Sequence, residues 1–135
     1  MPDVHYHHDR KIDARELIDV LRRSTLDRRR PVHDEARIQR MLDQADILIT
    51  AWSSGLLVGV SRALSDFSYC CYLSDLAVDT AFQRQGIGKR LIEETHRVSG
   101  EQTTLILLAA PAAASYYPHI GMKQFTDCFL IEQKE

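Results

Sequence analysis

The sequence contains no long apolar run, little net charge and few cysteines. None of its apolar stretches approaches the roughly 20 residues of a transmembrane helix, and the first residues lack the basic and apolar regions of a secretory signal. A net charge of -2 gives no general attraction to nucleic acid or to an anionic membrane. We therefore expect a cytoplasmic protein that binds neither nucleic acid nor membrane.

Three cysteines are too few for a disulfide framework. Cys70 and Cys71 are neighbours in a predicted strand, where successive side chains point to opposite faces, so we do not expect them to pair. His5, His7 and His8 lie close together, but no cysteine or carboxylate cluster accompanies them at the spacing of zinc ligands. These histidines are expected on an edge strand, without a metal.

Length and composition are those of one globular domain. The 135 residues are 44% hydrophobic and 27% charged, which suffices for a sizeable buried core. No internal repeat, low-complexity segment or linker divides the sequence. We expect a single domain over residues 1–135.

The most informative stretch, residues 72–92, is predicted to form a strand, a short loop and a helix. Apolar side chains give strand character up to Val78. Residues 83–88 form a glycine-containing loop, and apolar residues at helical spacing continue as far as Gly100, which is placed to end the helix.

The loop before this helix has the composition of an anion site. The first N–H groups of a helix lack intrahelical partners and carry the positive end of the helix dipole. Gly86 and Gly88 remove the Cβ atoms that would keep an anion from the backbone, and Arg84, Lys89 and Arg90 add positive charge. A phosphate or diphosphate is the ligand that this arrangement favours.

Two common phosphate motifs do not fit. A P-loop requires glycine at position 83, which is Gln83, and a dinucleotide fingerprint requires glycine at position 91, which is Leu91. The pattern Gln83-x-x-Gly86-x-Gly88 instead resembles the acyl-CoA diphosphate loop of the GNAT N-acetyltransferase superfamily. An unrelated nucleotide or phosphosugar binder remains the alternative.

A second stretch strengthens the resemblance. Residues 113–122 are similar to the family's helix that ends in an aromatic residue, a tyrosine, three residues, a glycine and a large apolar residue. Tyr117 occupies the position of the tyrosine that acts as general acid in many members. The family often has asparagine at the end of the preceding strand, where this chain has Ala110.

The resemblance implies an α/β (α+β) fold. Its mixed, mostly antiparallel sheet of six to seven strands has a central parallel pair splayed into a V and is flanked by about four helices. The pattern along the chain predicts an edge strand near residue 6, helices over 14–23, about 34–44, 87–99 and 112–117, and strands over 46–52, 56–64, 69–78, 103–109, 123–126 and 128–131. The apolar run at 105–109 is typical of a strand covered on both faces.

The function implied by the resemblance is direct transfer of an acetyl group from acetyl-CoA to a primary amine of a small-molecule or peptide acceptor, with homodimerisation possible. Tyr117 is the predicted general acid, and Asp75 is the first choice of general base, ahead of Asp66 and His119. The predicted cofactor-binding residues are Leu76, Ala77, Val78, Gln83, Arg84, Gln85, Gly86, Ile87, Gly88, Lys89, Arg90 and Tyr117. A non-catalytic acyl-CoA sensor on the same fold is the alternative.

Basic residues also gather between the first two helices, at Arg22–Arg23 and Arg28–Arg30. The simpler interpretation is a solvated helix end, where cations interact well with the helix dipole. The functional interpretation, which comes from the resemblance, is that this loop borders the acceptor pocket.

Overall fold

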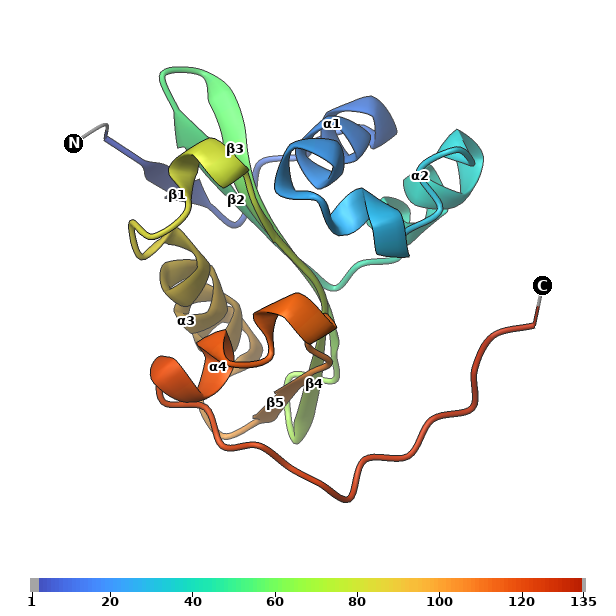
Figure 1. Ribbon diagram of the computed structural model, residues 1–135, viewed down its shortest axis with the longest axis vertical. Helices are drawn as coiled ribbons and strands as arrows, with labels where there is room; N and C mark the ends of the chain where they lie inside the picture. The colour runs from blue at the N-terminus through green and yellow to red at the C-terminus, as the bar shows by residue number, and fades with distance from the viewer. Residues whose placement is uncertain (1–2, 135) are drawn as a thin grey trace.

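The computed structural model describes residues 3–134, in which five strands form one mixed sheet (Figure 1). Along the sheet, the strands follow the order in which they occur in the chain. They are β1 (His5–His7), β2 (Ile47–Ser53), β3 (Leu56–Ser65), β4 (Cys70–Val78) and β5 (Thr104–Leu107). The first four pair in antiparallel fashion, and β5 pairs with β4 in parallel.

Helices cover both faces of this sheet (Figure 1). The α-helices are α1 (Ala14–Ser24), α2 (Glu35–Asp43), α3 (Ile87–Ser99) and α4 (Tyr116–His119), and single 3-10 turns occur at η1 (Leu26–Arg29), η2 (Thr80–Phe82) and η3 (Pro111–Ala113). One core joins α1 and α2 to side chains such as Trp52 and Val60, and the other joins α3 to side chains such as Ile49 and Val58. In the part of the chain that the structure describes, no helix combines the length and apolar character needed to cross a membrane.

Local sequence signals explain where the long helices begin and end. The Asp13 carboxylate accepts the Glu16 N–H and the Glu16 carboxylate accepts the Asp13 N–H, so α1 starts with a capping box. Gly86 precedes α3 with φ 81°, and Gly100 ends it with φ 107°. Glycine adopts such positive φ values at little cost.

Strand β4 has two different halves. Cys71 to Leu73 pairs with β3 on one edge, and Cys70 to Leu73 pairs with β5 on the other, where pairing stops at Leu73. Directly afterwards Ser74 is inserted as a β-bulge opposite β3. Because a bulge bends its strand and increases its twist, β4 turns away from β5, and the half from Ser74 to Val78 has one open edge.

The two strands predicted over residues 123–126 and 128–131 are not formed, so the prediction of six to seven strands was too high. This C-terminal segment follows Gly121, which has φ 96°, and runs outside the sheet without strand structure (Figure 1). Its apolar side chains, including Phe129, are exposed. Strand propensity is realised only where a partner edge is available to the segment, and here the chain leaves the β5 edge.

Two further boundaries differ from prediction. Strand β5 ends at Leu107, and it is not covered on both faces, since Ile106 is 53% exposed. The helix predicted over residues 112–117 is replaced by η3 and α4. Pro111 fits the first position of a helical turn, where its missing N–H costs nothing, but the turn ends after Ala113.

Candidate active site

We call residues Ser74–Val78, the part of β4 that is not paired with β5, the open half. A cavity of about 290 Å³ lies beside it. Its walls come from several parts of the chain, from η1 to α4. These are residues 24–26 and 29–30 around η1, residues 73–74 and 76–78 of β4 with Gln83, residues 107–108 and 110 after β5, and residues 112–113 and 117 near α4. The cavity therefore occupies the gap where β4 and β5 separate.

The backbone of the open half is the principal polar feature of this cavity. Leu76, Ala77 and Val78, three of the predicted cofactor-binding residues, all line it. The side chain of Gln83 donates to the Val78 carbonyl oxygen at 3.1 Å, which ties the loop to the end of the strand. Where no neighbouring strand is present, the N–H and C=O groups of a strand edge are available to an extended ligand.

The start of α3 lies next to this end of β4. No side chain caps the start of α3, since the residue at the cap position is Gly86. Arg84 has φ 65°, a strained value for a residue that is not glycine. Gly88 is buried against Tyr116, because a Cβ at that position would lie 2.9 Å from the tyrosine Oη. Burial raises the pKa of Tyr116, and the nearby Lys89 backbone opposes this rise.

The predicted loop residues therefore have different surroundings. Arg84 and Lys89 are exposed and Gln85 is half-buried, whereas Ile87 is a buried member of the α3 core. The Arg90 guanidinium lies 4.8 Å from the Tyr6 ring centroid and 3.7 Å from the Glu94 carboxylate. Of the predicted loop residues, Gln83 alone lines the cavity; those from Arg84 to Arg90 lie beyond it.

Tyr117, the predicted general acid, lies in the cavity wall. It is half-buried, and its ring centroid is 5.3 Å from that of Tyr116 in an edge-to-face arrangement. Burial raises the pKa of Tyr117 above 10.0, and the neighbouring Tyr116 raises the pKa further. The hydroxyl therefore keeps its proton at neutral pH.

Asp75 is in the open half of β4 but does not line the cavity. Its carboxylate is fully buried and accepts from Nε of Arg30 and, at 2.5 Å, from Nε of Arg62. Arg30 Nη2 also donates to the Ser74 carbonyl oxygen at 2.6 Å, and Arg62 Nη2 donates to the Ser74 hydroxyl at 3.1 Å. We call this group the Arg30–Asp75–Arg62 cluster.

The two other carboxylate or imidazole groups considered as bases are also outside the cavity. Asp66 caps the turn before β4 by accepting the N–H groups of Ser68, Tyr69 and Cys70, and these bonds lower the pKa of the carboxyl to about 2. His119 is exposed at the end of α4. Neither Asp66 nor His119 lines the cavity.

A second ion pair holds the far end of the open half. Arg23 of α1 donates from Nη1 to the Asp79 carboxylate at 2.6 Å and from Nη2 to the Leu57 carbonyl oxygen at 2.7 Å. Together with the Arg30–Asp75–Arg62 cluster, this pair connects the α1 side of the molecule to both ends of the open half. Side chains thus support the strand where β5 does not.

Sequence reasoning missed Arg62 and the bulge at Ser74. A signal was present, because Arg62 and Asp75 are single charges inside two otherwise apolar neighbouring strands, and such charges are rarely buried unless they pair. Arg29 and Arg30 were favoured as solvated residues, yet both line the cavity.

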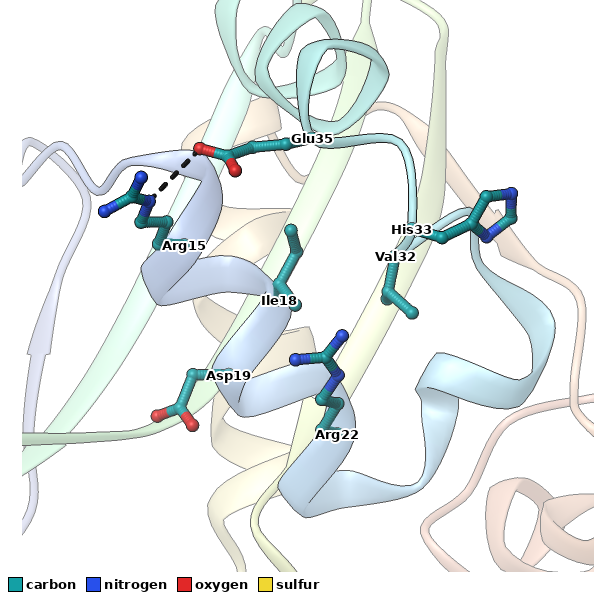
Figure 2. Close-up of a pocket in the computed structure, with 7 residues that line it drawn as sticks. All are labelled: Arg15, Ile18, Asp19, Arg22, Val32, His33 and Glu35. Carbon is teal, nitrogen blue, oxygen red and sulfur yellow. Dashed lines mark hydrogen bonds and ion pairs between the residues drawn. The ribbon is translucent and has the colours of Figure 1, made fainter.

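A separate surface pocket of about 350 Å³ lies between α1 and the start of α2 (Figure 2). Charged side chains of both signs surround it, and Arg15 and Glu35 form an exposed ion pair across it at 3.3 Å. It shares no lining residue with the cavity beside β4. Within residues 3–134, no three histidine, cysteine or carboxylate side chains are grouped to hold a metal.

A family model described as an acetyltransferase (GNAT) domain matches residues 20–129. The chain belongs to the GNAT acetyltransferase family. An uncharacterized N-acetyltransferase, ycf52, of Gracilaria tenuistipitata var. liui is 33% identical over 67 residues, which cover 48% of this chain and 37% of that protein. The chain spans between 27% and 37% of the length of the curated relatives that it matches.

Solved structures confirm the fold class. A GNAT-family acetyltransferase from Streptococcus pneumoniae TIGR4 superposes with a TM-score of 0.77 at 16% identity, covering 98% of both chains. The aminoglycoside N-acetyltransferase AAC(6')-Iy, solved in complex with CoA, superposes with a TM-score of 0.75 at 16% identity, covering 99% of this chain and 97% of that one. At such identities the likeness establishes the fold, with five strands in the described part of this chain.

Proposed function

We propose that this domain is a cytoplasmic N-acetyltransferase that moves an acetyl group from acetyl-CoA to a primary amine by direct transfer. The observation that carries the proposal is the open half of β4, whose free backbone edge faces a cavity that Gln83 and Tyr117 also line. All three cysteines are unpaired, which fits a reducing compartment.

Acetyl-CoA binding uses the two features that the loop and strand provide. The backbone from Leu76 to Val78 pairs with the extended pantetheine arm in place of a neighbouring strand. The first N–H groups of α3, next to Gly86 and Gly88, bind the diphosphate, with Arg84 and Lys89 adding positive charge. The carbonyl oxygen of the acetyl group accepts a backbone N–H of the open half.

Proton transfer in the reaction is assigned to Tyr117 and to solvent. Acetyl-CoA supplies a thioester, whose C–S bond breaks as the C–N bond to the amine forms. Tyr117 Oη gives its proton to the departing sulfur, which its raised pKa permits at neutral pH. Water in the cavity removes the proton that the amine loses, because none of the described residues lining the cavity is a histidine or carboxylate.

Asp75 then acts as a positioning residue. It is fully buried and its oxygens face Arg30 and Arg62, so it has no access to an amine in the cavity. By holding both guanidiniums, it fixes the backbone of Ser74 and the end of η1 that forms the cavity wall.

Calorimetry and thiol release together test the function. We expect acetyl-CoA to bind in preference to ATP and nicotinamide dinucleotides, and a screen of amines to reveal acceptors that release free thiol from acetyl-CoA. Binding of ATP without binding of acetyl-CoA would favour the nucleotide-binding alternative and contradict the proposal.

Tyr117→Phe separates an enzyme from a non-catalytic acyl-CoA sensor. The variant keeps the ring and should bind acetyl-CoA as the wild type does, while kcat falls about 100-fold or more because the proton donor is lost. Tyr72→Phe, at a half-buried strand position outside the cavity, is the control. Equal turnover by both variants would contradict the role of Tyr117.

We also propose that the protein forms a homodimer through its C-terminal segment. Phe125, Phe129, Leu130 and Ile131 are exposed there, and β5, which carries exposed Ile106, is the unpaired last strand of the described sheet. An open edge and a strand-forming segment on one chain are complementary in a twofold pair. Light scattering should give a dimer for the full chain and a monomer for a chain ending at Lys123; a monomeric full chain contradicts this proposal.

A further inference from the structure

The charged side chains that line the cavity beside β4 are all positive. Among the residues that the structure describes, they are Arg29 and Arg30, both from the connection between α1 and α2. The remaining titratable group in the wall is Tyr117, which is neutral at physiological pH, as a tyrosine ordinarily is. A ligand in this cavity therefore meets positive charge without a compensating carboxylate.

The positive charge is larger than the ion pairs can neutralise. In the Arg30–Asp75–Arg62 cluster, one carboxylate faces two guanidiniums, which leaves one positive charge in excess. The Arg30 side chain is 21% exposed and the Asp75 side chain is fully buried, so this excess charge is only partly screened by water. Arg29 is exposed and forms no ion pair within residues 3–134.

This charge lies at the opposite end of the cavity from the loop before α3. Arg30 donates to the Ser74 carbonyl oxygen, at the start of the open half, whereas Gln83 donates to Val78 at its other end. Four residues of strand separate these points by about 13 Å. At the Val78 end, Arg23 pairs with both Asp79 and Asp19, so this end has no excess positive charge. The excess charge therefore lies away from a diphosphate bound at α3.

We propose that the amine acceptor carries a carboxylate, which Arg29 binds in the field of the Arg30–Asp75–Arg62 cluster. This inference rests on the proposed transferase function and specifies its substrate class. Arginine suits the task because its planar guanidinium matches a carboxylate with two parallel hydrogen bonds. Polycationic amines are disfavoured, because no lining carboxylate in the described chain offsets their charge.

The positive charge in the cavity also bears on a second step of the reaction, the deprotonation of the amine. A primary amine must lose its proton before it attacks the thioester, and nearby positive charge lowers the pKa of an ammonium group. In a cavity without a histidine or carboxylate base, the excess charge of the cluster favours the neutral amine while Arg29 binds the carboxylate. Carboxylate binding and amine deprotonation are thus served by one arrangement of charges.

Matched acceptor pairs test the proposal. The probes are linear ω-aminocarboxylates of two to six carbons and Nα-acetyl-lysine, each compared with its primary amide, together with spermidine as a polycation. Thiol release from acetyl-CoA gives kcat/KM for each. We expect the best carboxylate to exceed its amide by about 10-fold or more, the effect of one charge-assisted pair, mainly through KM.

Variants of two neighbouring arginines provide the control. Arg29→Gln should raise KM for carboxylates about 10-fold and leave the amides unchanged, and Arg29→Glu should shift the preference toward spermidine. Arg28→Gln removes the same charge from an exposed neighbour that does not line the cavity, and it should match the wild type.

The outcomes separate this inference from the function itself. Bound acetyl-CoA with preference for amides or spermidine overturns the carboxylate acceptor and leaves the transferase intact. Bound acetyl-CoA without transfer to any probe, or a carboxylate preference that survives in Arg29→Gln, also overturns it. Failure to bind acetyl-CoA in calorimetry overturns the proposed function instead.

Discussion

The two halves of β4 show how one strand can serve both folding and ligand binding. From Cys71 to Leu73 the strand is paired on both edges, and from Ser74 to Val78 its only partner strand is β3. Unpaired backbone groups are costly unless solvent or another partner satisfies them. The open half is therefore the part of the sheet where a ligand adds hydrogen bonds that the protein itself does not make.

Side chains stabilise the open half in place of a strand. Arg30 donates to Ser74 and Asp75, Arg62 donates to Asp75, and Arg23 holds Asp79 just beyond the strand. The part of β4 from Cys70 to Leu73, which we call the closed half, needs no such support, because β5 supplies regular pairing. Changes to the supporting side chains or to the strand pairing should therefore show what each contributes to protein stability and to acetyl-CoA binding.

The largest effect is expected from Asp75→Asn, which removes the carboxylate between two largely buried guanidiniums. Loss of one partner of a buried ion group leaves uncompensated charge, so we expect the free energy of unfolding to fall by about 3 kcal/mol. Urea unfolding followed by circular dichroism measures the change. Asp43→Asn, at an exposed position of α2, should stay within about 0.5 kcal/mol; equal losses would refute the supporting role of the cluster.

Hydrogen exchange should resolve the two halves directly. Amides of Cys71–Leu73 are enclosed by two strands, and those amides of Ser74–Val78 that point away from β3 should exchange much faster. Acetyl-CoA at 100 times its Kd contributes about 2.7 kcal/mol to the bound state, so we expect these amides to slow about 100-fold when it binds. Exchange followed by NMR, with and without acetyl-CoA, measures this difference. Uniform protection along β4 without ligand would show that the second half is not open.

The sequence predicted the closed half and the loop better than the open half. The strand, the glycine loop and the helix after it follow from local patterns, and α3 ends at Gly100 as predicted. The bulge at Ser74 could not be predicted, because it depends on the register between β3 and β4, which is a non-local property.

The errors at the C-terminus have the same physical origin. Residues 123–131 have the composition of strands, but strand formation requires an available edge, and the segment leaves the sheet after Gly121. Likewise, a pattern of charges shows that Asp75 is unusual in an apolar strand, but only the packing places Arg30 and Arg62 against it. The site residues that follow from backbone chemistry, such as Val78, were therefore easier to find than those defined by ion pairing.

A smaller effect is expected where α3 meets α4 beside the open half. In Gly88→Val the new Cβ would lie 2.9 Å from Tyr116 Oη, so the Tyr116 side chain must move. Overpacking of this kind costs about 1–3 kcal/mol, and we expect calorimetry to show acetyl-CoA affinity reduced about 10-fold. Adding Tyr116→Ala should restore affinity. Gly55→Ala, at a distant hairpin glycine with φ 80°, should reduce stability without changing affinity; an affinity loss there would contradict a local cause.

The smallest change concerns pH. Burial raises the pKa of Tyr117, so the folded protein keeps this proton above pH 10.0, where a free tyrosine ionises. Proton donation by Tyr117 is therefore present below that pH and is lost as the pH rises through the higher value. The ratio of kcat for wild type to Tyr117→Phe should stay constant from about pH 7 to 10. Because the unfolded chain releases the proton first, the free energy of unfolding should also begin to fall above about pH 10. A ratio that declines below pH 9 would mean that Tyr117 ionises too easily to serve as the acid.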